Sequence, residues 1–148
     1  MRLPLDLREF IGLLNSENVE YAIAGGWALG FYGRPRYTKD LDIVIRSTPE
    51  NAARMEQVLR RFGFTSLGLK AADFLTADQI IQIGNAPQRI DILTTLTGVD
   101  PDELWSSRET GNLDGIAVFF VGRSVFIKNK RASGRPRDLA DLDDLSES

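Results

Sequence analysis

The stretch YAIAGGWALGFYGRPRYTKDLDIVI, residues 21–45, decides the fold. Its apolar start predicts a short strand over Tyr21–Ala24, and Gly25 and Gly26 follow as a turn. Trp27–Tyr32 then predicts a short helix, which ends at a glycine and is broken by a proline. A strand, a glycine turn and a helix in this order indicate an α/β unit.

The second strand of this stretch carries two acids. Leu41–Ile45 is β-branched and almost wholly apolar apart from Asp42, which is typical of a central strand. Outside residues 21–45, the pattern alternates between the two kinds of element and predicts an α/β chain. Helices are expected at 5–14, at 49–62 after a Thr48 cap, after Pro101, from Ser124 and at 137–145, and strands at 79–83, 89–94 and 116–121.

Length and composition exclude several classes of protein. The 148 residues suit one domain, which we expect to span 1–148, with 122–148 as a C-terminal helical extension. There is no cysteine and no histidine, so disulfides, thiolate or imidazole metal sites and Ser-His-Asp chemistry are excluded. No apolar stretch is long enough to cross a bilayer, and the acidic N-terminus is unlike a signal peptide, so a cytoplasmic location is expected. The chemistry is left to carboxylates, and any metal must be a hard ion bound by oxygen.

Three aspartates are the candidate metal ligands. Residues two apart in a strand project from the same face, so Asp40 and Asp42 can lean toward one point in front of the sheet. Asp91, in the run RIDIL, joins them if its strand is adjacent, because Arg89, Asp91 and Leu93 then share one face. Such a set could hold a pair of Mg²⁺ ions together with substrate phosphate oxygens.

Two other interpretations of the acids remain open. An Asp-x-Asp sequence can simply be the solvated edge of a strand. Acids beside wholly apolar residues need compensation, because burying unpaired carboxylates costs several kcal/mol. A cation is one compensation, and salt bridges from Arg34, Arg36 or Lys39 are the rival one.

Gly25 and Gly26 suit a phosphate. Glycines between a strand and a helix let backbone N–H groups approach an anion, and the helix turns its positive end toward it. The alternative is a tight turn with no ligand. The two downstream acids favour a phosphate-binding site. In such a site the backbone amides and the metal-bound carboxylates hold the triphosphate between them.

The segment GGWALGFYGRPRYTKDLDIVI resembles the signature of the polymerase-beta-like nucleotidyltransferase superfamily. The resemblance covers about residues 21–94, and KNKRASGRPRDLADLDDL at 128–145 is similar to a lysine-containing helix in small prokaryotic members. Antibiotic nucleotidyltransferases of the lincosamide type and toxin–antitoxin nucleotidyltransferases are the most similar in style. The resemblance implies a mixed central sheet flanked by helices.

The resemblance also implies roles for particular residues. Gly25 and Gly26 would contact the triphosphate, Asp40 and Asp42 would bind two Mg²⁺ ions, and Asp91 would bind the catalytic metal and help to deprotonate the acceptor hydroxyl. The implied reaction is in-line attack on the α-phosphate of an NTP with release of pyrophosphate. Many members have Gly-Ser where this chain has Gly-Gly, so one hydroxyl contact is missing.

The sequence offers several further residues that could bind the nucleotide, each with an alternative structural role. Arg36 and Thr38 precede the acids in the order Arg-x-Thr-x-Asp-x-Asp and either bind the nucleotide or belong to a structural ion pair. A basic cluster in the tail either neutralises the triphosphate, with Lys128 as the expected contact, or contacts a nucleic acid, or is a solvated surface paired with nearby aspartates. Its members are Lys128, Lys130, Arg131, Arg135 and Arg137.

Two functions are therefore expected. The first is Mg-dependent transfer of an NMP to an unidentified hydroxyl on a small molecule, an RNA or a protein. The alternative is a catalytically weak binding or antitoxin protein that acts through a partner chain or a second copy, because no large helical domain for acceptor recognition follows Asp91. A hydrolase with the same metal site is a third and weaker possibility.

Overall fold

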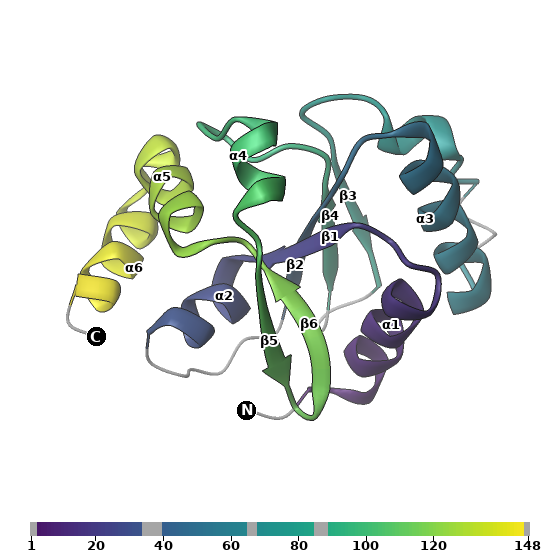
Figure 1. The fold of residues 1–148 in the computed structure, drawn as a ribbon, viewed down its shortest axis with the longest axis horizontal. Helices are drawn as coiled ribbons and strands as arrows, with labels where there is room; N and C mark the ends of the chain where they lie inside the picture. Colours follow the sequence, from purple (N-terminus) through teal and green to yellow (C-terminus); the bar gives the residue numbers. More distant parts are fainter. Residues whose placement is uncertain (1–2, 34–39, 65–67, 85–88, 147–148) are drawn as a thin grey trace.

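The computed structural model describes residues 3–33, 40–64, 68–84 and 89–146. Its centre is a six-stranded sheet in the order β3-β4-β2-β1-β6-β5, flanked by helices (Figure 1). The strands are β1 (Tyr21–Ala24), β2 (Leu41–Ile45), β3 (Ile80–Ile83), β4 (Ile90–Leu93), β5 (Glu109–Leu113) and β6 (Ile116–Phe120). The helices are α1 (Leu5–Ser16), α2 (Gly25–Tyr32), α3 (Pro49–Phe62), the 3₁₀ turn η2 (Ala71–Phe74), α4 (Pro101–Ser106), α5 (Arg123–Ser133) and α6 (Pro136–Ser146).

The sheet is mixed, as the resemblance implies. β2 runs antiparallel to β1 and parallel to β4, while β1 and β6 are parallel. The two edge strands, β3 and β5, are antiparallel to their neighbours. The acidic strand β2 is therefore central, and β4 is its direct neighbour.

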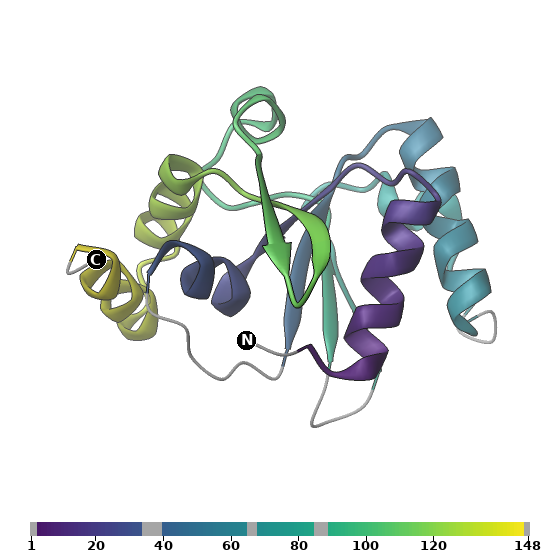
Figure 2. The ribbon, with the colours of Figure 1, turned by 60° about the horizontal axis from the view of Figure 1, so that its bottom comes forward.

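Helices cover the two faces of the sheet unequally. α1 and α3 pack together on one face, whereas α2, α5 and α6 lie on the other (Figures 1 and 2). The apolar positions of α1 follow the helical period, and Leu7, Phe10, Ile11 and Leu14 are all buried. The second face thus holds the glycine turn and the basic C-terminal helices together.

The predicted ends of α3 are confirmed. The Thr48 hydroxyl accepts a hydrogen bond from the Asn51 backbone N–H at 3.2 Å, and Pro49 is the first helical residue. Gly63 ends the helix in the left-handed conformation, with φ of 94°. Capping signals in the sequence therefore located this helix correctly.

Two predictions about the elements need correction. α2 begins at Gly25 and not at Trp27, so the glycine pair is the first turn of the helix and not a loop before it. β5 was not predicted, because ETGNL lacks the apolar alternation of a strand, and it forms an edge hairpin with β6. The turn expected at residues 85–87 lies outside the described residues. None of the described helices is both long and apolar enough to cross a membrane.

Candidate active site

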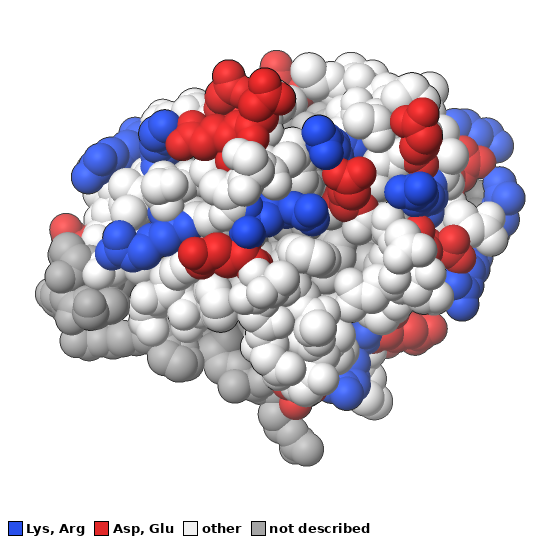
Figure 3. All heavy atoms as spheres, viewed as in Figure 1, with Lys and Arg blue, Asp and Glu red and all other residues white. Residues whose placement is uncertain are grey.

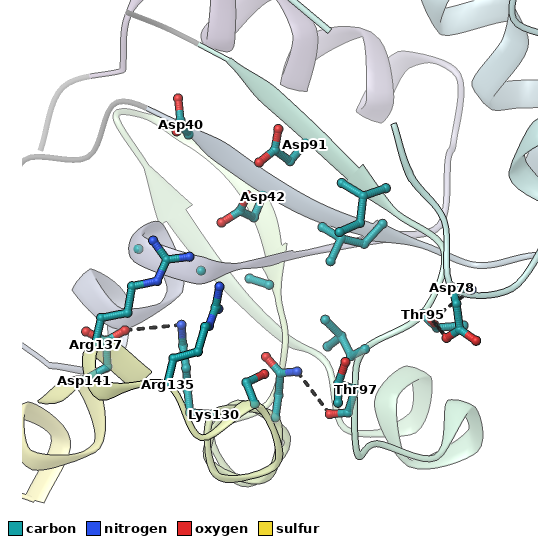
Figure 4. A pocket seen from close by; sticks show the side chains of 18 of the residues that line it. Asp40, Asp42, Asp78, Asp91, Thr95, Thr97, Lys130, Arg135, Arg137 and Asp141 are labelled. Atoms are coloured by element: carbon teal, nitrogen blue, oxygen red, sulfur yellow. Dashed lines mark hydrogen bonds and ion pairs between the residues drawn. The ribbon is translucent and has the colours of Figure 1, made fainter. Parts of the chain in front are cut away.

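Asp42 and Asp91 lie side by side on neighbouring parallel strands. They are Cα partners in the β2–β4 register, so their side chains leave the same face of the sheet (Figure 4). Burial, and after it the negative charge of Asp91, together raise the pKa of Asp42 to about 6. The Asp91 Oδ1 atom is buried and has no hydrogen-bond partner among the described residues. This pair is a concentrated negative charge that an added cation would stabilise.

Asp40 does not lean toward the same point as Asp42, although the two-residue spacing predicts that it does. It lies just before β2, and its Oδ1 accepts a hydrogen bond from the Arg89 backbone N–H at 3.2 Å. Its Oδ2 is 3.4 Å from Arg89 Nη2. In Figure 4 the Asp40 side chain points away from Asp42. Within the described residues, no three acidic side chains come close enough together to form a metal cluster. Repulsion between like charges and the attraction of Arg89 account for this separation.

The glycine turn lies against the acidic strand. Ala24 is the Cα partner of Asp42, and Gly25 follows with φ of 62°, a conformation that favours glycine. A Cβ atom on Gly25 would overlap the Asp42 carboxylate, because it would lie only 2.9 Å from the Cγ atom of Asp42. Gly25 and Gly26 form the N-terminal turn of α2 and line the pocket, where backbone N–H groups and the helix dipole favour an anion.

A basic wall faces the acids across the pocket. It consists of Lys130 on α5, Arg135 between the helices and Arg137 on α6 (Figure 4). Lys130 Nζ lies 3.3 Å from Asp138 Oδ1 and 3.2 Å from Asp141 Oδ2, and only 12% of its side chain is exposed. The C-terminal helices therefore deliver fixed positive charge to the pocket.

The other predicted binding residues are not in this wall. Lys128 is on α5 but outside the pocket lining, and its Nζ donates to both carboxylate oxygens of Glu103 at 2.7 and 2.9 Å. Residues 128 and 130 are two positions apart, about 200° around the helix axis, so their side chains project to nearly opposite sides of α5. A nucleotide contact by Lys128 stays a prediction. Arg36 and Thr38 lie outside the described residues, as do the rival partners Arg34 and Lys39.

The pocket extends beyond the acids and the basic wall. Its volume is about 890 Å³, and its far end is bounded by β3, the 94–97 loop and α5. There Asn129 Nδ2 donates to the Thr97 carbonyl at 3.1 Å, and Thr95 Oγ1 donates to Asp78 Oδ1 at 2.8 Å. None of these residues was predicted from the sequence, because isolated polar residues in loops and on a helix surface carry no periodic signal. The volume is sufficient for a ligand larger than a triphosphate alone.

The donor atoms fit a hard divalent cation. Mg²⁺ is usually bound through one or two carboxylates plus substrate phosphates, and Asp42 with Asp91 supplies two. The unpartnered Asp91 oxygen and the raised pKa of Asp42 are both relieved by a nearby positive charge. Asp40 could join only if its carboxylate turned away from Arg89.

Comparisons with known proteins agree with the geometry. The family model for aminoglycoside-2''-adenylyltransferase matches residues 6–119, more than half of the chain. The chain is also similar in structure to a candidate nucleotidyltransferase from Thermotoga maritima, with a TM-score of 0.62 and 16% sequence identity, over 96% of this chain and 91% of that one. At that identity the likeness concerns the fold. No curated protein matches the sequence.

Proposed function

Because the chain belongs to the aminoglycoside-2''-adenylyltransferase family, we propose that it transfers a nucleoside monophosphate from an NTP to a hydroxyl acceptor, with Mg²⁺, and releases pyrophosphate. The observation that carries the proposal is the contact between Gly25 and Asp42, with Asp91 in register beside them. This contact places a phosphate-binding helix end next to a pair of carboxylates.

The chain's own residues would divide the triphosphate between two surfaces. The amides of Gly25 and Gly26 would hold phosphate oxygens from the side of the sheet. Lys130, Arg135 and Arg137 would hold them from the C-terminal helices, where charge-assisted hydrogen bonds to phosphate are strong. Two such surfaces orient the α-phosphate for attack in line with the departing pyrophosphate.

Asp42 and Asp91 would hold the metal, which supplies positive charge to the phosphate oxygens when bound. Asp91 would also accept the proton of the acceptor hydroxyl as that oxygen bonds to the α-phosphorus. The bond from the α-phosphorus to the bridging oxygen then breaks, and pyrophosphate leaves with the electron pair.

The acceptor proposed for this chain is a small molecule. In Figure 3 acidic and basic side chains are interspersed over the described part of one face, which differs from the broad basic surface typical of nucleic-acid binding. The far end of the pocket presents Thr95, Thr97 and Asn129, which suit a hydroxylated ligand. The family's name makes an aminoglycoside the first acceptor to test, with ATP as the first donor.

A transfer assay tests the proposal. Purified chain is incubated with Mg²⁺, α-labelled ATP and a panel of aminoglycosides, and labelled product and pyrophosphate are both measured. We expect label on an acceptor with the wild type and none with Asp42→Asn or Asp91→Asn. Equal labelling by wild type and variants would refute the assignment, and pyrophosphate with free AMP alone would indicate hydrolysis.

One observation favours the alternative of a weakly catalytic binding protein that acts through a partner chain. The described residues hold no group of three acids close enough to form a metal cluster, because Asp40 is paired with Arg89. A chain that binds no MgATP but copurifies with one specific protein, as toxin–antitoxin pairs do, would support that alternative.

A further inference from the structure

Arg89 sits where a cation is needed. Its guanidinium lies between Asp40 and Asp91, 3.4 Å from Asp40 Oδ2 by Nη2 and 3.6 Å from Asp91 Oδ1 by Nε. Both partners are acids that the proposed function uses, and Arg89 itself lines the pocket. One arginine therefore neutralises two candidate metal ligands.

Both side-chain contacts are weak. The Arg89 Nε and the Asp91 Oδ1 are each buried without a hydrogen-bond partner in the described parts of the chain, because 3.6 Å is too long for a hydrogen bond. The Arg89 and Asp40 side chains are 42% and 41% exposed, so water screens their attraction. A divalent cation binds carboxylate oxygens at about 2.1 Å and carries twice the charge, so it competes effectively for the same oxygens.

The backbone of Arg89 is held by hydrogen bonds that do not involve its guanidinium. The Arg89 carbonyl accepts a hydrogen bond from Leu41 N–H at 2.9 Å, and the Arg89 N–H donates to Asp40 Oδ1 at 3.2 Å. These bonds hold the two strands in register where β2 and β4 begin. The guanidinium can therefore leave the carboxylates by side-chain rotation alone, without loss of strand pairing.

We propose that Arg89 is a positioning residue that acts as a displaceable counter-ion: it pairs with Asp40 and Asp91 until a divalent cation takes its place. This inference rests on the proposed metal-dependent function. It predicts that metal binding includes the cost of separating Arg89 from the acids, and that removing the guanidinium strengthens metal binding.

The test is a titration of the nucleotide-free protein with Mn²⁺, in which the EPR signal of free Mn²⁺ measures how much is bound. We expect Arg89→Gln to bind Mn²⁺ roughly three- to tenfold more tightly than the wild type, because two weak ion pairs no longer compete. Arg137→Gln is the matched control. It removes the same charge from the same pocket, but the ion pairs of Asp40 and Asp91 are with Arg89, so a smaller gain is expected. Equal gains in both variants would show a general field effect and overturn the inference.

A second readout separates pairing from other roles. Without metal, Arg89→Gln should melt at a lower temperature than the wild type, and Mn²⁺ should raise its melting temperature by more. If Arg89→Gln proves too unstable to titrate, Arg89→Lys should show a smaller gain in the same direction, because one ammonium cannot bridge both carboxylates as a guanidinium fork does. Unchanged or weaker Mn²⁺ binding in these variants overturns the inference but leaves the proposed function standing. Failure of the wild type and Arg89→Gln alike to bind Mn²⁺ would refute both.

Discussion

The backbone of Gly25 lies against the carboxylate of Asp42. Asp42 lies in β2 and pairs with Ala24, the last residue of the antiparallel strand β1, and Gly25 begins α2 directly after that pair. Close approach and a φ of 62° both require glycine here. The glycine turn and the acidic pair are therefore one structural unit, and a change in one affects the other.

Gly25→Ala should disrupt that unit. The left-handed backbone costs an alanine about 1–2 kcal/mol, and the overlap with Asp42 adds about 1–3 kcal/mol. Gly63→Ala is the control, because Gly63 has φ of 94° but open space around its missing Cβ. Urea unfolding should show a larger loss for Gly25→Ala, together with lost transfer activity. Equal losses would mean that contact with Asp42 is unimportant.

Asp42→Asn should abolish transfer but stabilise the metal-free protein. The folded-state pKa of Asp42, about 6, lies above its ordinary value of 3.8. The protonated carboxyl therefore adds to the free energy of unfolding at low pH, and this contribution is lost as pH rises through 6. At pH 7.5 the wild type thus carries a buried charge beside Asp91, and asparagine does not. We expect a melting temperature a few degrees higher at pH 7.5 and little difference near pH 4. A lower melting temperature at pH 7.5 would contradict this account.

The fold and the acidic pair could be predicted from sequence because their signals are local. Runs of apolar and β-branched residues located β2 and β4. The two-residue period of a strand put Asp91 on the same face as Arg89, while Ile90 and Ile92 turn inward and are buried. Adjacency of the two strands came from the family resemblance, and the sheet order confirms it.

The opposite wall of the pocket could not be predicted because it depends on tertiary packing. Lys128 and Lys130 are equivalent in composition and in local pattern, and the docking of α6 alone decides which of them faces the pocket. The pairing of Arg89 with Asp40 also depends on the tertiary fold. The rival counter-ion was expected among residues 34–39, immediately before Asp40. Its partner in the described residues is Arg89, which comes just before β4 and is 49 positions away.

Asp138 should contribute to stability at neutral pH and not in acid. Its side chain is fully buried; burial alone would raise its pKa, but hydrogen bonds from Arg135 and the charge of Lys130 outweigh burial and lower it. A lowered pKa gives stability that is present above the ordinary value of about 3.9 and is lost as pH falls below it. Asp138→Asn should cost about 1–3 kcal/mol at pH 7, because Lys130 loses one of its two carboxylate partners while Asp141 remains.

The measurement for Asp138 is urea unfolding at a series of pH values. The wild type and Asp138→Asn should differ most at pH 6–7 and converge toward pH 3. Asp73→Asn is a suitable comparison, because Asp73 caps an exposed turn through the Lys70 N–H and faces no buried lysine. Parallel curves for wild type and Asp138→Asn down to pH 3 would show that the carboxylate charge is not what stabilises the helix pair.

Lys130→Met should weaken binding of the NTP more than Lys128→Met does. Lys130 is held over the pocket by Asp138 and Asp141, whereas Lys128 is bound to Glu103 outside the pocket lining. Both changes remove one charge from the same helix, so they affect the net charge equally, and only position distinguishes them. We expect KM for ATP to rise about tenfold for Lys130→Met, as for the loss of one charge-assisted hydrogen bond, and far less for Lys128→Met. The reverse order would restore Lys128 as the phosphate contact and require α5 to turn in the loaded enzyme.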